Sequence, residues 1–316
     1  MTLQQQNLKA PVRQSNMELL RIVAMFFIVV FHCAYKSSIP CDSLTINTFC
    51  VKAMWYLGEL GVNLFMLVTG YFMVTGSFKG RKLILLVCQV LFYWWLCVAI
   101  GSALGIYTFP EAKNNAILQL FPILTGKYWY VTAYVVIYIL SPWINRFIQC
   151  VSQRSLLSFL LVMFLLYSVV PTLFGLLGVK VEGMLFYTRL IWLFIIYIAG
   201  AYLRLYPLKT FSNWRIPAIV SSVCILIMLI TIVAIATHPT FFAKLGVTEW
   251  TYFWPPNTIP MAILSVGVFG LFLNFNIPNN RFINRIASTT LGIYLLHDSV
   301  LQSYIWRGGY SMRHLL

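Results

Sequence analysis

The chain has 316 residues, of which 60% are apolar and only 9% are charged. Water-soluble globular proteins carry about 25% charged residues, so this composition excludes a soluble domain and predicts an all-α polytopic membrane protein. The net charge of +15 does not indicate a nucleic-acid partner, because the 22 Lys and Arg are scattered in ones to threes between apolar segments, as the positive-inside rule describes.

Apolar stretches long enough to cross a bilayer recur along the whole chain. Most of the 22 Lys and Arg fall on one side of these stretches, and the positive-inside rule assigns that side, with the N-terminus, to the cytoplasm. We expect one membrane-embedded domain over residues 1–316 with nine to ten helices, and the abrupt end of the chain suggests that the last helix is missing. The predicted spans are residues 17–36, 52–76, 83–107, 128–148, 156–178, 187–206, 217–237, 257–275 and 286–306.

The first span carries three ionisable side chains on one face. At ~100° per residue, the eleven residues from Arg21 to His32 bring the two side chains within roughly 20° of each other, about 16 Å apart along the axis. Glu18 lies three residues before Arg21 and joins the same stripe. Because ionisable groups at membrane depth normally face a protein interior or a wet cavity, the stripe predicts a functional site. The alternative for His32 is a packed or hydrogen-bonded histidine without a catalytic role.

Glu59 and Asn63 lie one turn apart in the second span, with Glu59 at about the depth expected for His32. A carboxylate there can orient the imidazole and stabilise its protonated form, and we assign Asn63 to the substrate site. The alternative for Glu59 is a carboxylic acid that hydrogen-bonds between helices. We expect the glycines of this span to allow close helix contact rather than to bind phosphate, because no GxGxxG or P-loop spacing exists.

A basic cluster, Lys79, Arg81 and Lys82, follows the second span at its cytoplasmic end. Cations at this position can hold the phosphates of an anionic cytosolic donor, and Arg21 lies one helix away at a similar depth. The alternative is a cluster that only sets the topology.

Two further groups are assigned to substrate binding. Trp129 and Tyr130 lie at the outer end of their span, where aromatic side chains either line a groove for a sugar or anchor the helix at the membrane interface. His297 and Asp298 lie about 16 Å into the last span, near the middle of the membrane, where two ionisable residues are costly unless they face a cavity.

Two long outer connections, residues 108–127 and 238–256, mix proline with aromatic residues. They either pack over an external cavity or form interfacial loops. Cys41 and Cys50 flank a short outer loop, and their spacing leaves a disulfide open. The sequence contains no Cys/His metal spacing and no GxSxG or HExxH motif, so we expect no metal.

Several of these segments together resemble the integral-membrane acyltransferase-3 family, particularly its bacterial surface-polysaccharide O-acetyltransferases. They are Arg21-x10-His32, GVNLFMLVTGYF, KYWYVTAYVVIYILSPWIN and GIYLLHDSV. The resemblance covers nearly the whole chain, and the Arg-x10-His spacing is its most specific part. The segment from Lys79 to Lys82 stands in the place of the family's basic motif without the usual paired arginines, and Thr69 stands where many members have Ser.

The resemblance implies transfer of an acetyl or other short acyl group from cytoplasmic acyl-CoA to a hydroxyl of a glycan outside a bacterial cytoplasmic membrane. His32 and Arg21 match the essential histidine and arginine of the family motif. We expect His32 to act as a general base on the acceptor hydroxyl, and the thioester to be attacked directly without an acyl-enzyme. Acyl-CoA is then a co-substrate, and the partners are the lipid bilayer and a glycan acceptor.

Two other functions have similar sequence requirements. A proton-coupled transporter or glycan exporter would show the same hydropathy and would use membrane-embedded His, Arg and Glu as a relay, although related halves with broken helices are not visible at corresponding positions. An inactive membrane subunit with an assembly role is the third candidate. Labelling of a polysaccharide that depends on acyl-CoA separates the enzyme from both.

Overall fold

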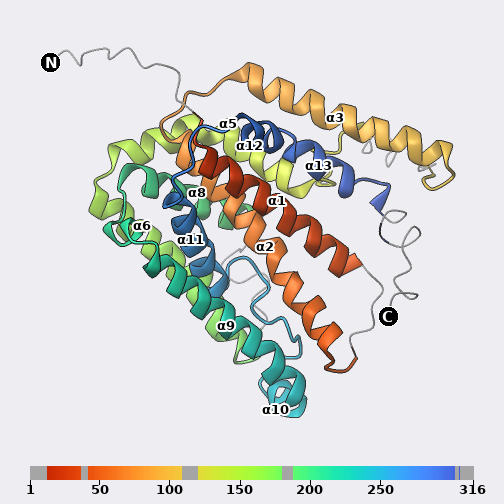
Figure 1. The fold of residues 1–316 in the computed structure, drawn as a ribbon, viewed down its shortest axis with the longest axis vertical. Helices are drawn as coiled ribbons and strands as arrows, with labels where there is room; N and C mark the ends of the chain where they lie inside the picture. Colours follow the sequence, from red (N-terminus) through yellow and green to blue (C-terminus); the bar gives the residue numbers. More distant parts are fainter. Residues whose placement is uncertain (1–12, 37–41, 109–119, 180–187, 303–305, 307–316) are drawn as a thin grey trace.

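The computed structural model describes residues 13–36, 42–108, 120–179, 188–302 and 306, and these residues form helices and connecting turns without a strand (Figure 1). The helical elements are α1 (Ser15–Lys36), α2 (Ile46–Met73), α3 (Gly80–Ala103), α5 (Trp129–Cys150), α6 (Gln153–Phe164), the π-helical turn η1 (Leu165–Val169), α7 (Val170–Gly175), α8 (Arg189–Leu205), η3 (Lys209–Ser212), α9 (Arg215–Thr237), α10 (Pro239–Lys244), α11 (Ile259–Leu273), α12 (Arg281–Ala287) and α13 (Thr290–His297).

The all-α polytopic class is confirmed. Among the described residues, six helical segments are long and apolar enough to cross a membrane: α1, α2, α3, α5, the continuous segment Gln153–Gly175, and α9. The helices α8 and α11 are shorter and largely buried, so the predicted total of nine to ten spans is not confirmed. Large apolar side chains of α3 and α9, such as Phe92 and Ile219, are exposed, as expected for surfaces that face lipid.

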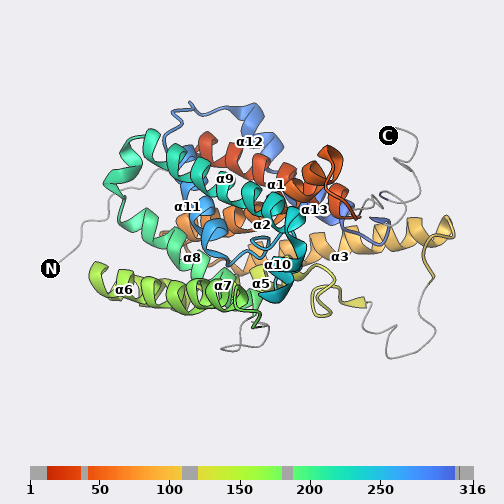
Figure 2. The same ribbon diagram turned by 90° about the horizontal axis from the view of Figure 1, so that it is seen from below.

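Helix α2 forms the centre of the bundle and packs against α1, α8 and α11. Figure 2 shows α12 and α5 on opposite sides of α1 and α2. A Cβ atom on Gly70 would collide with the backbone of Tyr197 in α8, and one on Gly200 would collide with the backbone of Leu67 in α2. The glycines therefore permit close backbone approach, as predicted for this span.

The predicted single helix over residues 286–306 is wrong, because two short helices, α12 and α13, replace its first half. Ser288, Thr289 and Thr290 occupy the junction, and their hydroxyls donate hydrogen bonds of 2.6, 2.8 and 2.9 Å to the carbonyl oxygens three residues earlier. Such local bonds offer the backbone an alternative to the helical pattern. The break lets α13 turn its last residue, His297, toward α1.

The loop between α10 and α11, which the sequence predicts on the outer side, is fastened to the π-helical region. Tyr252 donates a 2.6 Å hydrogen bond to the Thr172 carbonyl, and the Asn257 amide donates one of 2.8 Å to the Tyr167 carbonyl. Burial raises the pKa of Tyr252 to about 12, so its hydroxyl stays protonated and able to donate. These bonds hold Trp254 over the outer part of the bundle, as expected if this connection packs over a cavity.

Helix α5 tolerates an internal proline because a neighbouring side chain compensates for it. Pro142 cannot donate to the carbonyl of Tyr138, and the Ser141 hydroxyl donates a 2.7 Å hydrogen bond to that oxygen instead. The same helix caps the end of α2, since Asn145 donates to the carbonyl of Met73 at 2.8 Å. Helix α5 is thereby held alongside α2.

Candidate active site

A cavity of about 910 Å³ extends along α1, and its walls come from α1, α2, α3, α5, α8, α12, α13 and the Trp254 loop. Arg21 and Lys36 lie at the two ends of its α1 wall, about 22 Å apart along the helix axis at 1.5 Å per residue. This length covers most of the ~30 Å hydrocarbon core of a bilayer. Arg21 and His32 both line the cavity, as their spacing on one helical stripe predicted.

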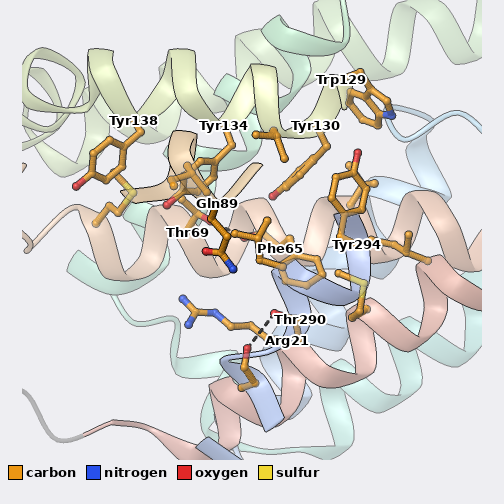
Figure 3. A pocket seen from close by; sticks show the side chains of 18 of the residues that line it. Arg21, Phe65, Thr69, Gln89, Trp129, Tyr130, Tyr134, Tyr138, Thr290 and Tyr294 are labelled. Carbon is orange, nitrogen blue, oxygen red and sulfur yellow. Dashed lines mark hydrogen bonds between the residues drawn. The ribbon is translucent and has the colours of Figure 1, made fainter. Parts of the chain in front are cut away.

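The end of the cavity near the N-terminus of α1 is basic. Arg21 pairs with Glu18 at 3.2 Å and lies 5.7 Å from the centre of the Phe72 ring. Lys82 also lines the cavity, and its side chain is exposed. Figure 3 shows the Arg21 side chain across the pocket from the tyrosines of α5.

The three cations predicted to act together are separated by the structure. Lys82 lies in the cavity wall, whereas Lys79 and Arg81 are exposed and are not part of it. Lys79 meets the wall only through its backbone, whose N–H donates to the Tyr138 hydroxyl at 3.2 Å. Only one cation of the cluster therefore stands beside Arg21 in the wall.

Aromatic side chains of α5 cover one wall. Tyr130, Tyr134 and Tyr138 follow each other at four-residue spacing and point into the cavity, with Trp129 at the end of the row (Figure 3). Their helical spacing places all three hydroxyls on one side of α5. Trp129 and Tyr130 thus lie where the substrate-binding prediction requires them.

His32 contacts a second histidine across the bundle. Its Nδ1 lies 3.0 Å from Nε2 of His297, and Nδ1 of His297 lies 2.8 Å from the carbonyl oxygen of Ile293. A carbonyl only accepts, so Nδ1 of His297 must carry a proton and donate it, and its Nε2 in the neutral ring must accept. Nδ1 of His32 then donates, which leaves Nε2 of His32 with a free lone pair. The hydrogen-bond chain fixes the tautomer that a general base needs.

An acidic side chain stands beside that lone pair. Oδ1 of Asp298 lies 3.9 Å from Nε2 of His32 and accepts a 2.8 Å hydrogen bond from the Lys36 ammonium. Lys36 also donates to the side chain of Gln302. At 3.9 Å the carboxylate is too far for a hydrogen bond with the neutral ring, but its charge favours the imidazolium that forms when Nε2 takes up a proton.

His297 and Asp298 therefore differ from their predicted role. They are not part of the cavity wall, and they lie beside the two ring nitrogens of His32. The contact of His297 with His32 spans 265 residues and follows from the break before α13. We assign them to the positioning of His32 rather than to substrate binding.

Glu59 lines the same cavity, but its charged partner is not His32. Its Oε1 accepts a 2.9 Å hydrogen bond from Nη2 of Arg189, and its Oε2 is buried without a partner among the described residues. The expected orientation of His32 by Glu59 is therefore not what the contacts show, because His297 and Asp298 approach the ring instead. Arg189 was not singled out in the sequence, where it reads as one of many topology-setting cations before an apolar helix.

The predicted substrate role of Asn63 is wrong. Asn63 is fully buried outside the cavity wall; its amide donates to the Pro256 carbonyl at 2.9 Å and to the Ser265 hydroxyl at 3.0 Å, and its oxygen accepts from the indole of Trp192 at 3.0 Å. All its partners belong to the protein, so Asn63 joins α2 to α8, α11 and the outer loop. Pairing of Cys50 with Cys41 stays a prediction, since Cys41 lies outside the described residues.

Comparisons with known proteins give one match. A family model for the acyltransferase-3 family, described as an acyltransferase domain, matches residues 14–311. The match covers α1 with Arg21 and His32 as well as α13 with His297. No curated protein and no solved structure matches the chain.

Proposed function

The chain belongs to the acyltransferase-3 family and is a multi-pass membrane protein, and from this premise we propose that it is an O-acyltransferase. In this proposal an acetyl or other short acyl group passes from cytoplasmic acyl-CoA to a hydroxyl of a glycan on the outer side of a bacterial cytoplasmic membrane. The observation that carries the proposal is a cavity lined by Arg21 near one end and by His32 toward the other, where the hydrogen bond of Nδ1 to His297 leaves Nε2 of His32 as the basic nitrogen.

The basic end of the cavity suits the donor. Coenzyme A carries phosphates, and Arg21 together with Lys82 supplies a planar guanidinium and a point charge for them. The pantetheine arm is long and uncharged, and the cavity between this end and His32 is lined by apolar and tyrosine side chains such as Met25, Phe65 and Tyr130. The thioester can therefore lie close to His32 while the phosphates remain at the basic end.

The chemistry follows from the tautomer of His32. The acceptor hydroxyl oxygen attacks the thioester carbonyl while Nε2 of His32 takes the hydroxyl proton, so a C–O bond forms and the C–S bond breaks. Asp298 stabilises the resulting imidazolium, and the imidazolium returns the proton to the departing thiolate. The products are an ester and free coenzyme A. The side chain that follows His32, Cys33, is not part of the cavity wall, which favours direct transfer over an acyl-enzyme.

The test uses the purified protein reconstituted in nanodiscs. Its substrates are acetyl-CoA and glycans extracted from the cells that make the protein. Free thiol release and ester formation on the glycan are measured together, the latter by mass spectrometry. His32→Ala should lower transfer by about 10²–10⁴-fold, the usual contribution of a general base. A matched variant is Cys33→Ala, whose side chain neighbours His32 in sequence and lies outside the cavity wall; it should retain activity.

Transfer retained in His32→Ala at the wild-type rate contradicts the proposal. Transport of the glycan across proteoliposomes without any ester formed from acetyl-CoA also contradicts it, and it favours the exporter. Both variants must elute as monodisperse protein, so that a loss of activity reports chemistry rather than unfolding.

A further inference from the structure

Four side chains at the outer part of the cavity form a cluster that the mechanism above does not use. They are Glu59 of α2, Trp129 of α5, Arg189 of α8 and Trp254 of the outer loop, and all four line the cavity. The centre of the Arg189 guanidinium lies 4.8 Å from the ring centroid of Trp129 and 5.9 Å from that of Trp254. Arg189 is thus held between two indoles and tied to Glu59 at 2.9 Å.

Two polar atoms of this cluster are buried with nothing to bond in the part of the chain that the structure describes. Oε2 of Glu59 accepts no hydrogen bond, and Nε1 of Trp254 donates none. Glu59 is only 3% exposed, and a buried carboxylate oxygen without a donor is costly. One free acceptor and one free donor beside aromatic faces match the chemistry of a hydroxyl-rich ring, whose hydroxyls both donate and accept.

The cluster lies close to the reacting group. The ring of Phe31 stacks on Trp254 at 6.0 Å between centroids and lies 5.0 Å from the ring of His32. A Cβ atom on Gly58, the neighbour of Glu59, would collide with the Phe31 ring, so Glu59 lies at the level of Phe31 and His32. The Phe31 ring therefore links Trp254 to the base.

The charges of the cluster indicate which ring it takes. Arg189 is neutralised by Glu59, and the free oxygen left over belongs to a carboxylate, which repels an anionic ligand. Lys36, the nearby cation at the outer end of α1, is already paired with Asp298. Both Arg189 and Lys36 are therefore paired, and neither is free to bind the carboxylate of an acidic sugar.

We propose that Glu59, Arg189, Trp129 and Trp254 form the acceptor subsite and that it binds a neutral pyranose ring rather than a uronic acid. This inference rests on the proposed function, since it assigns the acceptor to the outer side of His32. Glu59 accepts a hydrogen bond from a ring hydroxyl through Oε2, and Nε1 of Trp254 donates one to a ring hydroxyl oxygen.

The test measures binding apart from chemistry. Intrinsic tryptophan fluorescence of the full chain in nanodiscs is titrated with a panel of neutral methyl pyranosides and with the matching methyl pyranosiduronates, which differ only in a carboxylate for the CH₂OH group. Neutral members of the panel should change the signal and their uronates should not. Glu59→Gln keeps an oxygen for Arg189 but replaces the free acceptor with a donor, and it should weaken binding by about tenfold or more.

Trp254→Phe should remove most of the fluorescence response, while Trp214→Phe, an exposed tryptophan at the start of α9, should leave it intact. Equal binding of neutral and acidic rings, unchanged binding by Glu59→Gln, or no binding of any neutral pyranoside overturns the inference. Thiol release that depends on His32 with extracted glycan is recorded on the same preparations. If that release persists while the panel fails to bind, the subsite is wrong and the acyltransferase proposal stands.

Discussion

The contact between His32 and His297 makes a quantitative prediction. His297→Leu removes the acceptor for Nδ1–H of His32 with little change in volume, and the fixed tautomer and ring orientation are lost with it. A neutral hydrogen bond contributes about 0.5–1.5 kcal/mol, and one to a charged group about 1.5–3 kcal/mol. Because the His32 ring becomes cationic in the transition state, the larger range applies there.

A loss of 1.5–3 kcal/mol in the transition state corresponds to a fall of about 10- to 150-fold in kcat. The KM values for acetyl-CoA and the glycan should change little, since His297 is not part of the cavity wall. His297→Gln places a carbonyl oxygen near the same position and should recover part of the lost rate. Thiol release measured against both substrates in nanodiscs provides these numbers.

The double variant decides whether the effect passes through His32. If His297 only positions the base, adding His297→Leu to His32→Ala should cost nothing further, because no base remains to be positioned. The reasoning is refuted if the double variant loses kcat by the product of the two single losses. It is also refuted if kcat is unchanged in His297→Leu, or if His297→Gln has no higher kcat than His297→Leu.

Three other predictions separate structural roles from substrate contacts. Asn63→Ala should lower the free energy of unfolding by about 2–5 kcal/mol, because several buried polar groups lose their partner, while kcat per folded molecule stays unchanged. A raised KM for the acceptor at unchanged thermal stability would show instead that Asn63 binds substrate. Gly70→Ala should lower the free energy of unfolding by about 1–3 kcal/mol or more, because its Cβ meets backbone that cannot move aside. Gly80→Ala, whose Cβ would meet only the Phe78 ring at 4.0 Å, should leave the thermal midpoint unchanged or higher. Equal midpoints of the two variants would show that the α2–α8 crossing can relax. Lys82→Gln should raise the KM for acetyl-CoA about 2- to 5-fold at low salt, which is the size expected for an exposed charge contact. Arg81→Gln should leave this KM unchanged. Equal effects of the two variants would show that the whole basic cluster binds the donor.

Local periodicity was enough to predict the parts of the site that lie on one helix. The placement of Arg21 and His32 on one face of α1 follows from 3.6 residues per turn alone, and both residues line the cavity. The glycines of α2 were identified as contact points because a helix surface without side chains allows close approach. The all-helical class followed from composition.

The pairings across the bundle could not be predicted in the same way. His32 meets His297 only because three consecutive hydroxyl residues break the last predicted helix, and Glu59 meets Arg189 only because α8 packs against α2. The hydropathy pattern predicts neither contact, since both depend on which helices become neighbours. The run of Ser288, Thr289 and Thr290 was a readable signal for the break, because such residues compete with the helical hydrogen bonds around them.

The link between α1 and α13 sets the order in which the protein can become active. His297 is synthesised 265 residues after His32. Until α13 has been made and has packed against α1, His32 lacks the group that selects its tautomer. In the proposed mechanism the base therefore becomes competent only once α1 and α13 are in contact.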